Sequence, residues 1–322
     1  MKSIGNMVYK QMAKVVLTST QTKNFSNEEI DKTVARAIDL LGFNFTDEIE
    51  NVIIKPNLCY YWDYSTGETT DPRIVSALID YVRRRLGGDV NIVIAEADAS
   101  AMKTKYSFKI LGYDKLSRTK NVKLVNLSDG DIVNVKVNVG KKEFELPVNK
   151  ILLESNLIIN VPKLRTHNLA RITCTLKNMF GAIAKPRKYD YHKMLSYAIV
   201  GINKIVRSKI NLVDGLIARG SIPKKLGVLV AGDDPLATDF IAAKIMGINP
   251  RNVEYLRLAE KEQIGTVSNI ELVEDKIKLT EIKKKFPSYS YFRHEVSWKM
   301  QLKMLRMYAA VVGDVIPPVL EQ

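Results

Sequence analysis

The chain has 322 residues, of which 46% are hydrophobic and 26% are charged, and its 49 Lys and Arg against 35 Asp and Glu give a formal net charge of +14. This composition is typical of a globular protein and excludes a disordered or fibrous one. Two cysteines, Cys59 and Cys174, are too few for a disulfide framework, a four-cysteine zinc site or a self-contained iron–sulfur cluster.

The first predicted element is a helix. Ser26, with Glu29 three positions later, forms a capping-box pattern. Apolar residues then recur at helical spacing as far as Leu41, and Gly42 supplies a stop. A short buried strand is predicted next, at 52–54.

A second helix begins at Asp71-Pro72, because proline is favoured at the first helical position, and it ends at Gly87-Gly88. Residues 90–95 then form an almost unbroken apolar run. Such a run is typical of a strand in a parallel sheet that is covered on both faces.

The rest of the chain continues this alternation. Further elements are predicted as strands at 122–127, 157–159, 210–213 and 226–231, a β-hairpin at 131–147, and a helix from Asp234-Pro235 to Gly247. Strands separated by helices predict an α/β fold with a mostly parallel sheet flanked by helices. We expect one large domain over 1–322, with the hairpin as a small insertion and 266–322 as a C-terminal helical extension. Within that extension, apolar residues recur at helical spacing from Ser290 to Gly313.

Polar residues directly follow five of the predicted strands. They are Lys55-Pro56-Asn57, Glu96 with Asp98, the stretch from Lys163 to His167, Asp214-Gly215, and Gly232-Asp233-Asp234. In open α/β sheets, ligands bind where the carboxyl ends of the strands converge. We therefore expect the five loops to share a pocket that holds both cations and carboxylates.

Several short motifs occur in a fixed order. They are Lys55-Pro56-Asn57, Thr69-Thr70-Asp71-Pro72, Pro162-Lys163-Leu164-x-Thr166-His167, Leu176-Lys177-Asn178-x-Phe180-Gly181, Asp214-Gly215 and Asp234-Pro235-Leu236-Ala237-Thr238-Asp239. Their order resembles the family called domain of unknown function 362, over about residues 52–265. That family has no settled common activity. Many relatives carry a cysteine-rich, ferredoxin-like segment, so the resemblance implies a redox or cofactor-assembly role, but this chain lacks the cysteines for such a cluster.

The predicted catalytic residues are His167, Lys177 and Lys55. An ordinary histidine pKa of about 6.5 suits proton transfer near neutrality, and neighbouring cations favour the neutral imidazole that can act as a base. Lysine attracts an anion as a point charge, and arginine binds it through a bidentate fork. The predicted substrate-binding residues are Asn57, Lys163, Arg165, Thr166 and Asn178. A solvated basic surface and a structural histidine are the competing interpretations.

Four carboxylates are the candidate metal ligands: Glu96, Asp98, Asp214 and Asp239. Oxygen-rich ligands favour Mg²⁺ or Mn²⁺. The sequence has no compact ligand spacing such as His-x-x-x-His, and charge balance for the basic loops is the alternative role of these residues. A divalent metal is thus a possible cofactor. No glycine-rich loop typical of a dinucleotide or P-loop site occurs.

The excess positive charge is concentrated between Val161 and Lys225, where 14 basic residues face 2 acidic ones. Because this stretch also contains the candidate site motifs, we expect an enzyme or ligand-binding protein that handles a small phosphorylated or carboxylated metabolite. Nucleic-acid binding by the same stretch is the alternative, with tyrosines available for stacking.

The chain has no apolar run of the roughly 18 residues that a transmembrane helix needs. We expect a cytoplasmic protein.

Overall fold

The computed structural model describes residues 12–22, 25–100, 102–287, 303–304 and 307. Most of the Ser290–Gly313 pattern therefore lies outside the described residues. The strands are β1 (Ala13–Ser19), β2 (Asn51–Pro56), β3 (Asn91–Glu96), β4 (Lys123–Asn126), β5 (Ile132–Val139), β6 (Lys142–Asn149), β7 (Leu157–Val161), β8 (Lys163–His167), β9 (Arg171–Thr173), β10 (Ile210–Arg219), β11 (Pro223–Gly232) and β12 (Ile270–Asp275).

Helices connect most of these strands. They are α1 (Asn27–Leu41), α2 (Pro72–Leu86), α3 (Thr104–Ile110), α4 (Tyr113–Lys120), α5 (Lys150–Glu154), α6 (Thr175–Met179), α7 (Leu195–Ile205), α8 (Pro235–Ile245), α9 (Glu254–Lys261) and α10 (Leu279–Lys285). Short 3-10 helices lie at Tyr64–Thr66, Phe180–Ala182, Lys188–Met194 and Pro250–Asn252.

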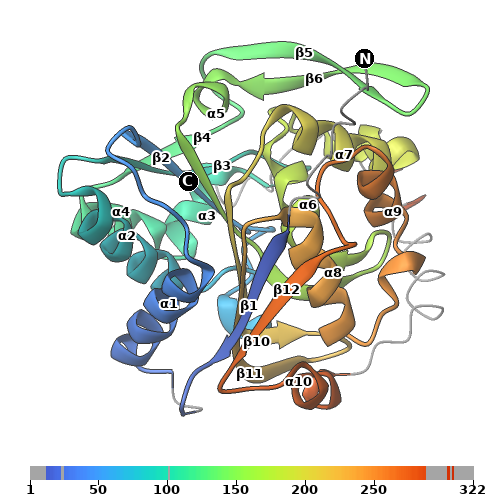
Figure 1. The fold of residues 1–322 in the computed structure, drawn as a ribbon. Coiled ribbons are helices and arrows are strands. Elements are labelled where there is room, and N and C mark those ends of the chain that lie inside the picture. Colours follow the sequence, from blue (N-terminus) through green and yellow to red (C-terminus); the bar gives the residue numbers. More distant parts are fainter. Residues whose placement is uncertain (1–11, 23–24, 101, 288–302, 305–306, 308–322) are drawn as a thin grey trace, which may run out of the picture.

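One large sheet organises the molecule, with the strand order β12-β1-β11-β10-β7-β2-β3-β4 and with β8 and β9 attached beside β10 (Figure 1). Most neighbouring strands are parallel, and the exceptions are the pairs β1–β11, β10–β11 and β8–β9. The predicted α/β fold with a mostly parallel sheet is therefore confirmed. β1 is held between β11 and β12, since Val15 lies opposite Gly232 on one side and opposite Leu272 on the other.

Helices cover both faces of the sheet and produce two hydrophobic cores (Figure 1). Alternate residues of one strand enter different cores: Val15 and Leu17 pack with α6 to α9, whereas Val16 packs with α1 and α2. This follows from the two-residue period of a strand. The sheet is thus the middle layer of three, and only its strand ends are free to form a site.

The first two predicted helices begin and end where the sequence indicates. The Ser26 side chain accepts a hydrogen bond from the Glu29 backbone N–H, and Gly42 ends α1 in the left-handed conformation with φ of 74°. At α2, the Asp71 side chain accepts from the Arg73 backbone N–H, directly before Pro72. Capping of this kind satisfies N–H groups that have no partner within the helix.

The predicted hairpin is present as β5 and β6, which form a separate two-stranded sheet around Gly140. It lies against α7 (Figure 1). The hairpin can approach α7 closely because residue 201 of α7 is glycine. A Cβ atom at Gly201 would lie 2.9 Å from the Phe144 ring of β6. The hairpin is therefore seated on the helical layer and does not extend the main sheet.

One expectation about the sheet is wrong. β11 runs antiparallel to β10, with Gly232 opposite Asn211 at the start of β10. The carboxyl end of β11, followed by Asp233 and Asp234, therefore lies at the opposite edge of the sheet from the carboxyl ends of β2 and β3. Asp234 instead caps α8 by accepting from the backbone N–H groups of Leu236 and Ala237. The fifth polar loop therefore does not join the pocket, and neither does Asp214-Gly215, which lies within β10.

Candidate functional site

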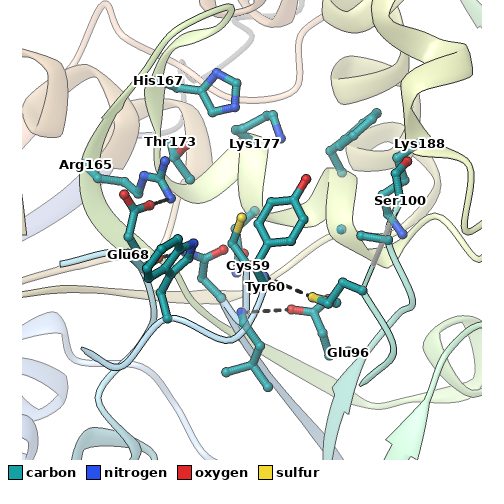
Figure 2. Close-up of a pocket in the computed structure, with 18 of the residues that line it drawn as sticks. Cys59, Tyr60, Glu68, Glu96, Ser100, Arg165, His167, Thr173, Lys177 and Lys188 are labelled. Atoms are coloured by element: carbon teal, nitrogen blue, oxygen red, sulfur yellow. Dashed lines mark hydrogen bonds and ion pairs between the residues drawn. The ribbon is translucent and has the colours of Figure 1, made fainter. Parts of the chain in front are cut away.

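A pocket of about 450 Å³ opens at the carboxyl ends of β2, β3 and β8. Helix α6, the loop that follows β2 and the segment around Lys188 close its other sides (Figure 2). The charged, histidine and amide side chains along its wall are Lys55, Asn57, Glu68, Glu96, Arg165, His167, Asn168, Lys177, Asn178, Lys188, His192 and Arg219. Seven of the predicted site residues are therefore brought together: Lys55, Asn57, Glu96, Arg165, His167, Lys177 and Asn178.

Lys55 and Glu96 form a buried ion pair at the base of this pocket. The Lys55 Nζ donates to Glu96 Oε1 at 2.8 Å, and the two side chains are 0% and 6% exposed. The Glu96 carboxylate also accepts from the backbone N–H groups of Leu58 and Ala97. Gly181 passes close by, since a Cβ there would lie 3.0 Å from Lys55 Nζ and 3.1 Å from Glu96 Oε1. A charged pair in this position is stable only because each partner is satisfied.

Helix α6 carries Lys177 and Asn178 and is fixed from two sides. Asp239 of α8 accepts from the backbone N–H groups of Thr175 at 2.6 Å and Leu176 at 3.1 Å. The Asn178 amide donates to Asn160 Oδ1 at 2.7 Å and to the Lys55 carbonyl at 3.3 Å. These bonds tie the helix to both α8 and the end of β2, so the position of Lys177 is set before any ligand binds.

The Lys177 ammonium has no carboxylate partner within ion-pair distance among the described residues. Its Nζ lies 4.5 Å from the centre of the Phe180 ring. Burial, with smaller contributions from Arg165 and Lys55, lowers the pKa of Lys177 to about 8. At pH 7 about a tenth of this side chain is therefore an uncharged amine, far more than for a lysine in water.

Lys188 reaches the pocket from the opposite wall (Figure 2). Its Nζ donates to the backbone carbonyl of Asp98, while the Asp98 carboxylate pairs with Lys103 at 3.1 Å. Burial is the main cause that lowers the pKa of Lys188 to about 7. Lys188 thus exchanges its proton in the physiological range.

Two arginines share one carboxylate, that of Glu68, which lies beside Arg165 at the left of the pocket in Figure 2. Glu68 forms ion pairs with Arg165 and with Arg219, the latter at 2.7 Å. The Arg219 guanidinium also donates to the carbonyl of Thr66. One carboxylate for two guanidinium groups leaves a positive charge that is uncompensated locally.

The His167 ring is held as a neutral hydrogen-bond donor. Its Nδ1 accepts from the backbone N–H groups of Leu169 and Ala170, each at 3.1 Å. Nδ1 therefore carries no proton, and in the neutral ring the proton is on Nε2. Burial, together with Lys177 and Arg165, holds the pKa of His167 well below 6.5. This geometry favours donation from Nε2 to a ligand over the general-base role that the sequence suggested.

Two hydroxyl groups at the pocket wall are buried without a hydrogen-bond partner among the described residues: Ser100 Oγ and Thr173 Oγ1. The Thr173 side chain is only 5% exposed. A buried polar group without a partner costs free energy, so such groups in a pocket mark positions where a ligand atom or water completes the bonding.

The thiol groups are poorly suited to nucleophilic chemistry. Cys59 lines the pocket, and burial raises its pKa. Cys174 is fully buried, and burial, with Asp239 nearby, raises its pKa well above the ordinary value. The reactive thiolate is therefore disfavoured at both positions.

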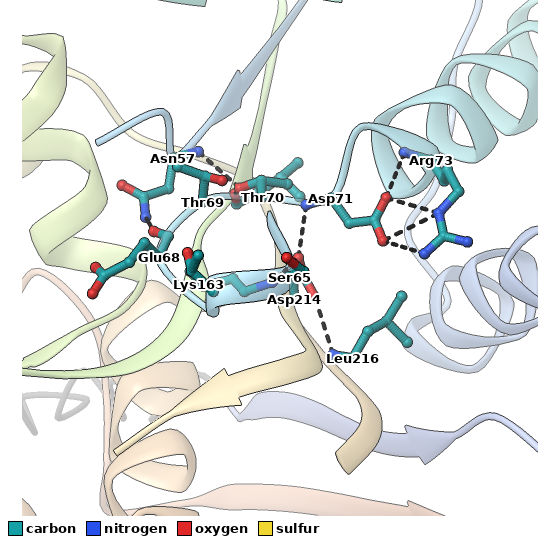
Figure 3. Close-up of polar contacts among 12 residues, drawn as sticks. Asn57, Ser65, Glu68, Thr69, Thr70, Asp71, Arg73, Lys163, Asp214 and Leu216 are labelled. Atoms are coloured by element: carbon teal, nitrogen blue, oxygen red, sulfur yellow. Dashed lines mark hydrogen bonds and ion pairs between the residues drawn. The ribbon is translucent and has the colours of Figure 1, made fainter. Parts of the chain in front are cut away.

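Lys163 does not reach the pocket. Its Nζ bonds to Asp214 Oδ2 at 2.7 Å, and both side chains are 0% exposed. Asp214 also accepts from the backbone N–H groups of Asp71 and Leu216 (Figure 3). This pair therefore fixes the start of α2 against β10, behind the pocket wall, and we regard it as structural.

The loop after β2 is held by the same network. Thr70 Oγ1 accepts from the Asn57 backbone N–H at 2.9 Å and donates to the Val161 carbonyl at 2.7 Å. The Asn57 side-chain amide donates to the Glu68 carbonyl (Figure 3). Thr166 is likewise buried, with its hydroxyl 3.5 Å from the Gly220 carbonyl, and it does not line the pocket.

The four candidate metal ligands have different partners. Glu96 pairs with Lys55, Asp98 with Lys103, and Asp214 with Lys163, while Asp239 accepts from α6. In the part of the chain that the structure describes, no group of three or more His, Cys, Asp or Glu side chains could hold a metal ion. The structure therefore does not bring these carboxylates together as a ligand set.

The pocket residues that were not in the predicted site include Glu68, Thr173, Lys188 and Arg219. Glu68 adjoins the Thr69-Thr70-Asp71 motif, and Lys188 lies in the basic stretch. Both positions were therefore weakly indicated as site residues by their sequence neighbours. Arg219 also lies in the basic stretch, but its place at the pocket, like that of Thr173, depends on how β10 and β9 pair with β8.

The basic stretch from Val161 to Lys225 does not form one uniform surface. Lys163, Lys177 and Lys188 point inward, towards Asp214 or the pocket. Lys185 pairs with Asp190 at 2.6 Å, and Lys204 pairs with Glu262 at 2.8 Å. Four of the fourteen basic residues of the stretch line the pocket, and six others are exposed: Arg187, Lys193, Arg207, Lys209, Lys224 and Lys225.

The family described as "Domain of unknown function (DUF362)" matches residues 52–244. A thylakoid-associated protein of Synechocystis sp. is 24% identical over 235 residues, which are 69% of this chain and 70% of that protein. Within the described part of the chain, no helix is both long and apolar enough to cross a membrane.

Two solved structures show a weaker likeness. A protein from Thermotoga maritima has a TM-score of 0.39 and 13% identity, over 74% of this chain. The lactate racemase apoprotein from Thermoanaerobacterium thermosaccharolyticum has a TM-score of 0.39 and 14% identity, over 70% of this chain. The chain spans little more than half of these two proteins, 58% and 56% of their lengths.

Proposed function

The chain belongs to the domain of unknown function (DUF362) family, and we propose that it binds a small anionic metabolite in the pocket described above and acts on it. One observation carries this proposal. Five cationic side chains line the pocket, Lys55, Arg165, Lys177, Lys188 and Arg219, against two carboxylates, Glu68 and Glu96. Burying such an excess is costly unless an anion compensates it.

The charge excess is concentrated at two lysines. Lys55 is neutralised by Glu96, and Arg165 and Arg219 share Glu68. Lys177 and Lys188 have no carboxylate within ion-pair distance among the described residues, and burial lowers the pKa of each. A carboxylate or phosphate group of the ligand would lie between them, where it would favour the charged form of both.

Neutral donors would orient the ligand. His167 would donate from Nε2, and the hydroxyl groups of Thr173 and Ser100 would gain the partners that they lack. Directional donors of this kind fix orientation in a pocket where lysines supply attraction. The pocket volume of about 450 Å³ is in the range of small-molecule sites.

Lys188 and Lys177 would also move protons. Their pKa values of about 7 and about 8 are matched to transfer near neutral pH, which is the condition for an effective general acid or base. We assign proton transfer to these lysines and hydrogen-bond donation to His167.

Binding can be measured directly, because Trp62 lines the pocket. In a Trp298→Phe background Trp62 is the single tryptophan, and its fluorescence would be followed during titration with mono- and dicarboxylates and with phosphate esters. We expect at least one ligand class to bind, and the Lys177→Ala and Lys188→Ala variants to bind it at least tenfold more weakly. Lys244→Ala is the matched control, because Lys244 also lies over an aromatic ring, Phe240, but is exposed. Lack of binding across the whole panel would refute the proposal.

A further inference from the structure

We infer that Lys177 is a nucleophilic amine that forms a Schiff base with the carbonyl group of an oxo acid. This inference rests on the proposed function, because it names the class of anion that the pocket accepts and the bond that forms there. Two observations support it: the position of Lys177 in the pocket, and the fact that the other pocket lysines already have hydrogen-bond or ion-pair partners.

Lys177 is the uncommitted lysine of the pocket. Lys55 Nζ bonds to Glu96, and Lys188 Nζ bonds to the Asp98 carbonyl. Lys177 Nζ faces the Phe180 ring and has no hydrogen-bond acceptor among the described residues. Its lone pair, in the neutral form, is therefore free to attack.

The backbone that carries Lys177 is rigid. Asp239 binds the N–H groups at the start of α6, and the neighbouring Asn178 bonds to Asn160 and to the Lys55 carbonyl. The Asn203 amide holds the Leu176 carbonyl at 3.0 Å. A nucleophile on a fixed element meets its substrate without a further ordering cost.

The surroundings of Lys177 raise the proportion of free amine above that of a lysine in water. Burial and the nearby Arg165 and Lys55 disfavour the ammonium form, which is the means by which enzymes activate lysine. The thiol of Cys59, the other potential nucleophile of the wall, is disfavoured because burial raises its pKa. Amine chemistry is thus the covalent chemistry that this pocket supports.

The remaining wall residues fit an oxo acid. Arg165 can bind the ligand carboxylate when that carboxylate replaces Glu68 as its ion-pair partner. His167 Nε2 can donate to the carbonyl oxygen of the ligand.

In the reaction, the Lys177 nitrogen bonds to the carbonyl carbon, and the carbonyl π pair passes to oxygen. A proton moves from nitrogen to that oxygen to give a carbinolamine. Loss of the hydroxyl with one further proton, as water, leaves the C=N bond, and Lys188 is positioned to donate that proton.

The test is reductive trapping on the full chain. The protein would be incubated with pyruvate, glyoxylate or 2-oxoglutarate and reduced with borohydride, and the modified residue identified by peptide mass spectrometry. We expect one stable adduct with at least one of these acids, located at Lys177. Labelling should fall at least tenfold in Lys177→Arg, which keeps the charge, and remain at the wild-type level in Lys244→Arg.

The outcomes separate the two proposals. If Trp62 fluorescence reports binding of carboxylates but no adduct forms at Lys177, the Schiff base is overturned and anion binding stands. Adducts spread over exposed lysines, or an unchanged yield in Lys177→Arg, also overturn it. If neither binding nor an adduct is observed, both proposals fail. Because the site of labelling is mapped on the wild-type chain, the result does not depend on the variants folding.

Discussion

The ammonium of Lys55 lies 2.8 Å from the carboxylate of Glu96, and this pair is buried between the end of β2 and the end of β3. The two strands are neighbours in the sheet. The pair therefore lines the base of the pocket and also links two neighbouring strands of the sheet. We expect it to matter for stability as well as for the site.

Breaking the Lys55–Glu96 pair should destabilise the protein strongly. We expect Glu96→Gln to lower the free energy of unfolding by about 3–5 kcal/mol, because it leaves a buried ammonium without its counter-charge. Chemical denaturation measures this loss. Glu271→Gln, in a largely solvated pair with Lys14 3.9 Å apart, is the control and should change stability by less than about 1 kcal/mol. Equal losses at the two sites would contradict the structural role of the buried pair.

Adding a methyl group at Gly181 should disturb the same pair. The Cβ of Gly181→Ala would approach Lys55 Nζ at 3.0 Å and Glu96 Oε1 at 3.1 Å, so both members of the pair would have to shift. We expect a loss of roughly 1–3 kcal/mol in thermal or chemical unfolding, typical of overpacking. Gly88→Ala is the control, since nothing lies within 4 Å of its Cβ. A neutral Gly181→Ala would show that the pair is more adaptable than its burial indicates.

Affinity for an anionic ligand should fall as the pH rises. In the free protein Lys188 loses its proton near pH 7 and Lys177 near pH 8. A bound anion favours the protonated lysines, so the complex binds more protons than the free protein and affinity declines above these values. Titrations of Trp62 fluorescence between pH 6 and pH 9 would measure a decline of about tenfold or more. A flat profile would exclude these lysines as ligand contacts.

Replacing Lys177 by methionine should stabilise the unliganded protein. Because folding lowers the pKa of Lys177 from 10.5 to about 8, the ammonium is disfavoured in the folded state. This penalty is fully present below pH 8 and is relieved as the pH rises towards 10.5. We expect Lys177→Met to gain roughly 1–3 kcal/mol at pH 7, and the gain to shrink towards pH 10.5. A gain that does not depend on pH would point to packing as its cause.

The His167 ring should stay neutral throughout the physiological range. Two backbone N–H groups bind Nδ1, and burial lowers the pKa of the ring. Nitrogen NMR should therefore show an unprotonated Nδ1 and a protonated Nε2, with no titration between pH 6 and pH 8. A titration near pH 6.5 would restore the general-base role. His167→Gln, which can still donate, should bind ligand better than His167→Ala.

Local signals predicted much of this structure. Ser26 and Asp71 cap the helices that they were expected to cap, because a cap depends on residues only two or three positions away. The polar ends of β2, β3 and β8 were expected to meet, and they do, because parallel strands bring their carboxyl ends to one edge.

Features that depend on pairing between distant parts of the chain could not be predicted from the sequence. The apolar run of β11 is the same whether the strand runs parallel or antiparallel, so its reversal beside β10 was not predictable. Lys163 and Lys177 also have the same chemistry in the sequence. Only the register that places Lys163 beside Asp214, 51 positions away, separates the structural lysine from the pocket lysine.

The placement of β1 has a consequence for synthesis on the ribosome. Both of its neighbours are made late: Val15 pairs with Gly232 and with Leu272. At translation rates of about 5–20 residues per second, more than 200 residues must follow, so β1 waits roughly 10–40 s for its first partner. The strands around the pocket, from β2 to β10, all emerge during that interval. The pocket can thus assemble first, and the first strand in the described part of the chain is among the last to be placed.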